Sequence, residues 1–266
     1  MTKARTLILI LLLLLHLPAI AIAAPAERVI KVCADPDPPP WTYWVRDASG
    51  KKTDQFTGAS VDLVRTIFNR LGVQVDFIGN VPWVRCLKLV ETGEFDFAMD
   101  AYADAERAKR FAYSAHYNTL TPQVFFRRDK PLDIRSIADL KRYQGCGMIG
   151  ASYAHYGLTP DDLDLGVTTY EAMIRKLKAG RCDYFVEELE VISGYKYLAQ
   201  DYLRDPALAH ASVADANPPA KHLIAAIGSP ASKLLPKFNK ELAAFIKSGA
   251  AAEIWQRHAP DLPYRP

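Results

Sequence analysis

Two stretches of the chain follow one plan: Trp83–Met99 (WVRCLKLVETGEFDFAM) and Tyr170–Val186 (YEAMIRKLKAGRCDYFV). In each, apolar residues recur at helical spacing and the run ends at a glycine, Gly93 or Gly180. A glycine just beyond the last turn is the usual end of a helix, and the short apolar run that follows is typical of a buried strand. The repeated helix–strand unit therefore predicts two similar α/β lobes.

Both units extend in the same alternating pattern. Around the first stretch we expect strands at 29–34, 73–78 and 95–99 and helices at 61–71 and 83–90. The second unit is expected to comprise a helix at 137–142, strands at 146–149 and 182–186 and a helix at 170–178, before a final strand at 222–227, an amphipathic helix at 234–246 and a short helix ending near 258. Strands alternating with helices indicate parallel α/β sheets.

Composition excludes two classes of protein. The 266 residues are 50% hydrophobic and 11% aromatic, which suits a packed core and not a disordered chain. A formal net charge of +3 provides little attraction for phosphates, so a nucleic-acid partner is not expected. The length fits one large domain or two small ones.

The N-terminus predicts export. Lys3 and Arg5 precede nine apolar residues, Leu7–Leu15, and Ala21-Ile22-Ala23 supplies small residues for cleavage. This pattern is typical of a secretory signal peptide at 1–23, and nine residues are too few to span a bilayer. Cleavage leaves 31 basic and 30 acidic side chains, a net charge of +1, in a protein expected in the periplasm.

Export affects the expected chemistry of the four cysteines. Cys33, Cys86, Cys146 and Cys182 are even in number and none forms a C-x-x-C pair. In an oxidising compartment two disulfides are expected, with three possible connectivities, and the alternative is buried free thiols. No Cys or His pair has the spacing of zinc ligands, so no metal is expected.

Catalytic motifs are absent from the sequence. It contains no G-x-S-x-G, no Walker P-loop and no H-E-x-x-H. Gly145–Gly150 does match G-x-G-x-x-G, but a strand is expected to run through the motif, where dinucleotide binding needs a strand before it and a helix after it. No cofactor is therefore expected.

A series of short motifs carries a family resemblance. In chain order they are Pro38-Pro39-Pro40-Trp41-Thr42-Tyr43, Phe56-Thr57-Gly58-Ala59-Ser60-Val61-Asp62-Leu63, Pro82-Trp83-Val84-Arg85, Gly93-Glu94-Phe95-Asp96, Glu106-Arg107-Ala108-Lys109, Tyr113-Ser114-Ala115-His116-Tyr117, Ile137-Ala138-Asp139-Leu140-Lys141 and Gly180-Arg181-Cys182-Asp183. In this order, over nearly all of residues 28–258, they resemble the family 3 periplasmic solute-binding proteins, the polar amino-acid receptors of ABC transporters. Each motif is weak, and their order is what makes the resemblance specific.

The resemblance implies an α/β, two-lobed periplasmic-binding-protein fold of type II-like topology. Two crossover segments, near 118–123 and 215–221, would join the lobes around a ligand cleft that closes by hinge motion. Lobe 1 would comprise 24–119 and 216–266, and lobe 2 would comprise 120–215. The same resemblance implies the pairs Cys33–Cys86 and Cys146–Cys182, one in each lobe, because strands carrying the second pair should be neighbours.

The resemblance also implies roles for side chains. Arg107 matches an arginine that grips the ligand carboxylate, with a surface ion pair to Glu106 or Asp104 as the alternative. Glu188 falls where an acidic residue pairs with the ligand ammonium, unless it is a solvated carboxylate. Further positions match a hydroxyl donor to the carboxylate and two aromatic rings that sandwich the ligand or pack in the core: Ser152, Trp41 and Trp83.

Some residues depart from the family pattern. Asp100, Tyr102 and Asp104 replace small neutral or hydroxyl residues, and Asp35 matches a position that can meet a distal cation in receptors for basic amino acids. If Asp100 lines the cleft, it repels a carboxylate held by Arg107, or else it tethers that arginine. The expected ligand is therefore more positive than a neutral amino acid, such as a basic amino acid or an amine.

Three functions share the implied fold. We expect a monomeric receptor that captures a small polar ligand and passes it to an inner-membrane ABC permease, and we do not expect an enzyme. A ligand-binding subunit of a membrane sensor would use the same lobes. A dehydratase-like secreted enzyme would need a general acid, a role open to Glu188 or Asp100.

Overall fold

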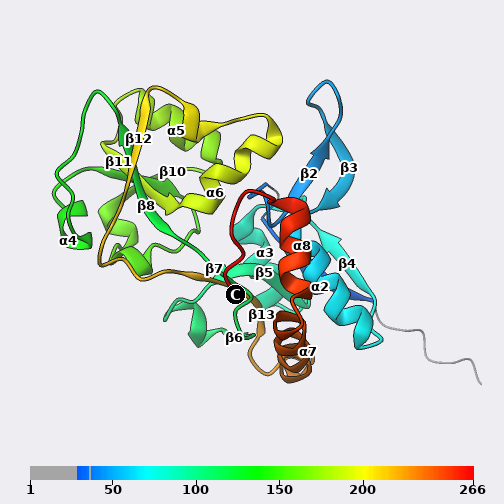
Figure 1. Ribbon diagram of the computed structural model, residues 1–266. Coiled ribbons are helices and arrows are strands. Elements are labelled where there is room, and N and C mark those ends of the chain that lie inside the picture. Colours follow the sequence, from blue (N-terminus) through cyan, green and yellow to red (C-terminus); the bar gives the residue numbers. More distant parts are fainter. Residues whose placement is uncertain (1–28, 36) are drawn as a thin grey trace, which may run out of the picture.

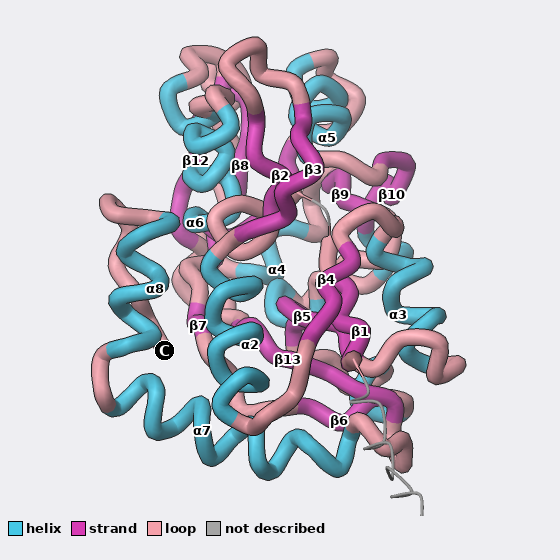
Figure 2. The backbone as a smooth tube through the Cα atoms, turned by 90° about the vertical axis from the view of Figure 1, so that its right-hand side faces the viewer, coloured by secondary structure: helices cyan, strands magenta, loops and turns pink. Residues whose placement is uncertain are grey.

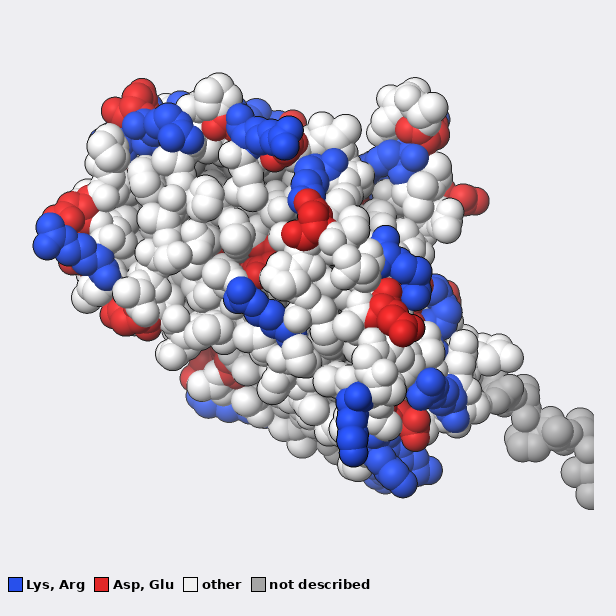
Figure 3. Space-filling model, viewed as in Figure 1, with Lys and Arg blue, Asp and Glu red and all other residues white. Residues whose placement is uncertain are grey.

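The computed structural model describes residues 29–35 and 37–266, which form two lobes (Figure 1). The expected signal peptide at 1–23 lies outside the described residues. Within the described part, no helix is long and apolar enough to cross a membrane. Acidic and basic side chains are interspersed over both lobes on the face shown in Figure 3, so no extended basic surface forms there.

Lobe 1, as we call the part built on the first sheet, begins with the predicted parallel strands. The sheet has the order β4-β1-β5-β13-β6, with β7 paired to β13. Its strands are β1 (Ile30–Cys33), β4 (Val75–Ile78), β5 (Phe97–Tyr102), β6 (Phe111–Tyr113), β7 (Asn118–Thr119) and β13 (Ala220–Ala226). β1 pairs in parallel with β4 and β5, whereas β13 runs antiparallel to β5 and β6.

Helices cover this sheet because their apolar residues fall on one side. They are α2 (Ala59–Arg70), α3 (Trp83–Glu91), α7 (Leu235–Lys247) and α8 (Ala250–His258). Phe68 of α2 packs against Phe97 of β5 and Phe238 of α7, with ring centroids 5.4 Å apart in both contacts. Figure 2 shows α2, α7 and α8 along the side of this sheet that faces away from α3.

Lobe 2 is built on a second sheet of order β10-β9-β11-β8-β12. Its strands are β8 (Pro122–Arg127), β9 (Gly145–Met148), β10 (Leu163–Val167), β11 (Tyr184–Glu188) and β12 (Leu208–Ser212), and its helices are α4 (Ile137–Leu140), α5 (Tyr170–Lys178) and α6 (Leu189–Gly194). Single 3-10 turns are η2 (Arg107–Lys109), η3 (Ala154–Tyr156), η4 (Pro160–Asp162), η5 (Tyr195–Leu198), η6 (Tyr202–Arg204) and η7 (Ser232–Leu234). β9 runs through the G-x-G-x-x-G match, so that motif does not open a helix.

Two strands extend further than the sequence predicts. The strand expected at 95–99 continues to Tyr102, because β13 pairs with β5 as far as Lys221↔Tyr102. The strand expected at 182–186 begins at Tyr184 and continues to Glu188, which pairs with Pro122 of β8. An unpredicted hairpin, β2 (Tyr43–Arg46) and β3 (Lys52–Thr57), forms a third, two-stranded sheet.

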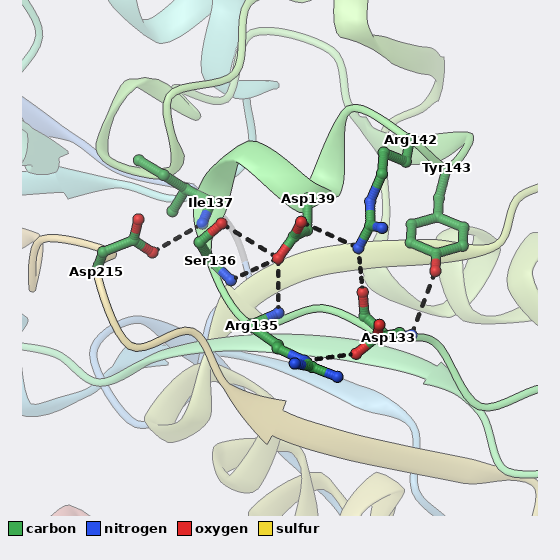
Figure 4. Close-up of polar contacts among 8 residues, drawn as sticks. All are labelled: Asp133, Arg135, Ser136, Ile137, Asp139, Arg142, Tyr143 and Asp215. Carbon is green, nitrogen blue, oxygen red and sulfur yellow. Dashed lines mark hydrogen bonds and ion pairs between the residues drawn. The ribbon is translucent and has the colours of Figure 1, made fainter.

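The chain passes twice between the sheets. β7 ends in the first sheet at Thr119 and β8 begins in the second at Pro122, and the chain returns between β12 and β13 over residues 213–219. The lobe limits proposed from the sequence, 119/120 and 215/216, fall inside these two segments. On the return, the Asp215 carboxylate accepts a hydrogen bond of 2.7 Å from the Ile137 backbone N–H at the start of α4, next to the Ser136–Asp139 capping box (Figure 4).

Both disulfide pairs implied by the resemblance are confirmed. Cys33–Cys86 joins the end of β1 to α3. Cys146–Cys182 joins β9 to a cysteine that lies two residues before the start of β11. The Cα–Cα distances are 5.8 and 5.7 Å, as this bond requires. Each bridge therefore stays within one lobe and leaves the two crossover segments free.

A candidate ligand-binding cavity between the lobes

The ends of the parallel strands place polar side chains where the lobes meet. Asp35 follows β1, Tyr102 ends β5 and Glu188 ends β11. Ligands of α/β proteins bind beyond the carboxyl ends of such strands. A cavity of about 610 Å³ of empty space, including its opening to solvent, lies there.

Both lobes contribute to the cavity wall. Seven of the eight residues expected to bind ligand line it: Asp35, Trp83, Asp100, Tyr102, Arg107, Ser152 and Glu188. The eighth, Trp41, does not. Its ring is 1% exposed, packs against Trp255 at 5.5 Å between centroids, and donates its indole N–H to Asn118 Oδ1 at 2.8 Å. These partners hold Trp41 in the lobe 1 core behind the cavity.

Other lining residues were not predicted from the sequence. They are Pro38, Met99, Met148, Ala151, Tyr153, His155, Tyr156, Tyr170, Val186, Glu187 and Lys221. Lys221 lies in the predicted second crossover. Because a crossover borders the cleft in a two-lobed fold, this position could have identified Lys221 as a cavity residue. His155 and Tyr156 belong to η3, a single turn without a sequence pattern, and only the fold of lobe 2 brings them to the cavity.

Glu188 is surrounded by donors from both lobes. Tyr102 of lobe 1 donates its hydroxyl to Glu188 Oε2 at 2.5 Å, while His155 Nε2 lies 2.8 Å from Oε1 and the Tyr156 hydroxyl 3.3 Å from it. Burial by itself would raise the pKa of Glu188, but hydrogen bonds from Glu187, His155 and Tyr102 lower it to about 2. Glu188 is therefore ionised.

The neighbouring carboxyl group behaves in the opposite way. Burial, and then the charge of Glu188, raise the pKa of Glu187 well above its usual value. Two adjacent buried carboxylates repel one another, so the pair retains one proton. The opposite directions of the two pKa shifts favour Glu187 as the residue that keeps the proton.

Lobe 1 holds a second acidic pair. Burial raises the pKa of Asp35 to about 6, although the charge of Lys221 opposes the shift. Burial also raises the pKa of Asp100, against the effects of Lys221, Ser60 and Tyr117. Lys221 is 5% exposed, and its ammonium lies over the rings of Trp41 and Tyr102 at 4.5 and 4.9 Å.

Arg107 is held by its own lobe. It is 7% exposed, its Nη1 donates to the Tyr102 backbone oxygen at 3.0 Å, and its guanidinium lies 5.8 Å from the Trp83 ring centroid. Asp104 accepts the Arg107 backbone N–H at 3.0 Å and the Ser152 hydroxyl of lobe 2 at 2.6 Å. Asp104 therefore links the arginine to the opposite lobe, and the lobes are closed on one another.

The arrangement suits binding. The described residues include no group of three or more His, Cys, Asp or Glu side chains that could hold a metal ion. The cavity instead combines four carboxyl groups, from Asp35, Asp100 and the Glu187–Glu188 pair, with the cations of Arg107 and Lys221. Closure around a solute would exclude water and strengthen each charged contact.

Comparisons with known proteins identify the family. The family described as bacterial extracellular solute-binding proteins, family 3, matches residues 30–261. The L-cystine-binding protein TcyA of Bacillus subtilis (strain 168) is 24% identical over 156 residues, which cover 59% of this chain and 56% of that protein. The chain thus matches little more than half the length of that relative.

Solved structures agree on the fold. The substrate-binding protein of an amino acid ABC transporter is 20% identical, with a TM-score of 0.70 over 88% of this chain and 100% of that one. A histidine kinase sensor domain is 24% identical, with a TM-score of 0.68 over 89% of this chain and 98% of that one. Together with the match across residues 30–261, these comparisons show that the chain belongs to the family 3 bacterial extracellular solute-binding proteins.

Proposed function

We propose that this protein captures a small solute with net positive charge, a basic amino acid or a related amine, and delivers it to an inner-membrane ABC permease. One observation carries the proposal: four carboxyl groups line the cavity, against two fixed cations. Arg107 lies next to the Asp104 carboxylate, which offsets part of its charge. When a bound cation draws protons from the buried carboxyl groups, their combined negative charge exceeds the charge of the two cations, and the cavity then favours a cation over an anion.

The protonation of the site supports the same ligand class. Burial, and then the charge of Glu188, raise the pKa of Glu187, and burial raises the pKa of Asp35 to about 6. A cation placed beside these groups favours their ionised forms. Binding of a cationic solute is therefore expected to release protons to the buffer, whereas binding of an anion would take protons up.

The remaining lining residues receive roles consistent with this proposal. Trp83 offers an aromatic face next to Arg107, and Ser152 and Tyr102 carry hydrogen bonds between the lobes. We propose that these contacts hold the closed lobes around the solute without converting it. The protein would act as a monomer in the periplasm after removal of residues 1–23.

Calorimetric titration tests the ligand class. The ligand-free protein is titrated at pH 6 with L-arginine, L-lysine, L-histidine, putrescine, L-cystine, L-glutamine and L-glutamate, in two buffers of different ionisation enthalpy. We expect a cationic compound to bind at least tenfold more tightly than L-glutamate and to release protons. Tight binding of L-glutamate alone would overturn the proposal.

A variant links the proton release to the site. Glu187→Gln cannot ionise and is expected to reduce the proton release, while Glu253→Gln, an exposed position on α8, is the matched control. Unchanged mass of the recovered ligand checks that it is not converted. Delivery is tested by uptake of the labelled ligand in cells with and without the gene, and loss of a signalling response in place of uptake would favour a sensor subunit.

A further inference from the structure

Resting on the proposed function, we infer that the head of an α-amino acid binds to Lys221 and Asp100, with its carboxylate on the lysine and its ammonium on the aspartate. The polar groups of the cavity differ in whether other protein groups already satisfy their hydrogen bonds. A group that a ligand contacts is expected to be buried and to lack a protein partner in the ligand-free chain. Lys221 and Asp100 meet this condition.

The two residues that the family resemblance favours are already engaged. Both oxygens of Glu188 accept hydrogen bonds, from Tyr102 on one side and from His155 and Tyr156 on the other. The Arg107 guanidinium donates to the Tyr102 backbone oxygen and lies over Trp83. A ligand that used these groups would have to displace contacts that also join or brace the lobes.

Asp100 presents an acceptor without a donor. Its Oδ1 accepts hydrogen bonds from Ser60 Oγ at 2.6 Å and from the Tyr117 hydroxyl at 2.8 Å, whereas Oδ2 is buried and has no partner among the described residues. The Asp100 backbone N–H donates to the same Tyr117 oxygen at 2.8 Å. The residue also has a left-handed backbone, with φ of 65°. Its side chain is thus held from two sides, and the residue lines the cavity.

Lys221 presents donors without an acceptor. Among residues 29–35 and 37–266 its ammonium forms no hydrogen bond or ion pair with a protein group, and its contacts are with the faces of Trp41 and Tyr102. Lys221 and Asp100 nevertheless line the same cavity, on β13 and on β5, which are paired. The aromatic rings hold the ammonium in place and leave its N–H groups available.

A free donor on Lys221 and a free acceptor on Asp100 suit a ligand that carries an acceptor and a donor close together. In an α-amino acid the carboxylate and the ammonium share one carbon atom. The carboxylate would neutralise Lys221 and the ammonium would satisfy Asp100 Oδ2. An amine that lacks the carboxylate would bring a second cation to Lys221 and leave its donors unused. The geometry therefore narrows the solute from cations in general to amino acids.

The test compares ligands that lack one half of the head. L-arginine is titrated beside agmatine, which has no carboxylate, and 5-guanidinovaleric acid, which has no α-ammonium. We expect L-arginine to bind the native protein about 10- to 100-fold more tightly than either analogue, as expected for a lost charged hydrogen bond. If another α-amino acid binds most tightly, its own amine and deamino analogues are used, such as cystamine for L-cystine.

Two variants should each remove the preference of the protein for L-arginine over one of the two analogues. Lys221→Met keeps the apolar stem of the side chain and is expected to lower the preference for L-arginine over agmatine below threefold. Continued binding of agmatine would show that the variant is folded. Asp100→Asn retains an oxygen for Ser60 and Tyr117, tolerates the left-handed backbone, and is expected to remove the preference over 5-guanidinovaleric acid only.

Controls separate this inference from the proposed function. Lys176→Met removes a lysine paired with Asp164 in lobe 2 and should leave both preferences unchanged. Arg107→Lys should retain the preference over agmatine. The inference is wrong if Lys221→Met keeps that preference within threefold of the native value, if Arg107→Lys abolishes it, or if no α-amino acid binds. Binding of a neutral amino acid with both preferences intact would contradict only the proposed charge class.

Discussion

Burial dominates the chemistry of individual carboxyl groups in this cavity. Asp35 is removed from water and its pKa rises to about 6, although Lys221 stabilises the charged form. Glu188 is equally buried, yet its pKa falls to about 2 because donors surround both of its oxygens. The difference lies in hydrogen bonding and not in distance from solvent.

The raised pKa of Asp35 predicts a pH-dependent loss of stability. Between about pH 4 and pH 6 the folded state keeps a proton that the unfolded chain has released, so the free energy of unfolding falls as pH rises through this window. The full effect is at most about 3 kcal/mol. Asp35→Asn removes this effect. Between pH 4 and pH 7 the free energy of unfolding of the variant, relative to that of the native protein, should therefore rise by up to that amount.

Urea unfolding of the ligand-free protein at pH 4, 5, 6 and 7 measures the difference. Asp164→Asn, at a surface ion pair, is the control and should give a curve parallel to the native one. The Glu188 contribution has the opposite sign and is lost only as pH falls from about 4.5 towards 2, and it is common to all three proteins. Parallel curves for Asp35→Asn and the native protein would contradict the prediction.

Motif matching located most candidate residues but not their partners. Arg107 and Glu188 follow recognisable segments, so their places could be predicted from order and spacing. Whether each has a free hydrogen-bonding group depends on Tyr102, which ends β5, and on His155 and Tyr156, which belong to η3. Trp41 shows the same limit, because only the packed core reveals that Trp255 and Asn118 hold its ring.

Among the elements, helices were easier to predict than strands. The helix expected at 170–178 matches α5, because Tyr170–Lys178 has one apolar face and Gly180 beyond its end. Strand ends depend instead on the neighbouring strand: β5 reaches Tyr102 because β13 pairs with it. The β2–β3 hairpin was missed because none of its strand residues is fully buried, and it is held by the Trp44–Phe56 contact and a hydrogen bond from Trp44 to the Gly79 oxygen.

The disulfide of lobe 2 is expected to stabilise that lobe without affecting binding. Cys146 and Cys182 are 36 residues apart, and a cross-link over such a loop contributes about 4 kcal/mol in the chain-entropy description. Replacing both residues by Ala should lower the free energy of unfolding by about this amount. Urea unfolding at 25 °C measures the loss.

Affinity for the ligand, titrated at a temperature where the variant is folded, should change less than threefold. The Cys33–Cys86 pair of lobe 1 closes a loop of 53 residues and provides the comparison, with a loss of similar size. A loss below about 1 kcal/mol, or a tenfold weaker affinity, would show that the bridge has another role.

Considered as a whole, the molecule is held closed by contacts between its lobes. Tyr102 donates to Glu188, Ser152 donates to Asp104, and the Tyr195 hydroxyl donates to the Asp37 backbone oxygen at 2.7 Å. The C-terminal segment adds to these, because the Asp261 carboxylate pairs with Lys196 and Tyr197 beyond α6. Closure therefore depends on several polar contacts around the cavity.

Gly194 allows the lobes to approach. It ends α6 in lobe 2, and a Cβ atom there would lie 1.9 Å from the backbone oxygen of Pro39 in lobe 1. Gly194→Ala should therefore hold the lobes apart, weaken ligand binding at least tenfold and increase the radius of gyration of the ligand-bound protein. Small-angle scattering with and without ligand, combined with calorimetry, measures both effects.

The control for this change is Gly166→Ala in β10, where a Cβ would meet only the ends of the Asp164 and Lys176 side chains. It should bind and close as the native protein does. Native affinity and compaction in Gly194→Ala would mean that Pro39 moves aside and that this contact does not limit closure.

The sequence by itself predicted the two α/β units, because helical periodicity and glycine helix ends are local properties of the chain. The order of its motifs carried the family resemblance, and that resemblance implied the cysteine pairs. The tertiary structure alone decided which polar groups of the cavity remain free. Lys221 and Asp100 lie 121 positions apart in sequence, yet both line one cavity from paired strands, β13 and β5. Whether a buried group is satisfied depends on every neighbour that folding brings to it, and no local pattern records those neighbours.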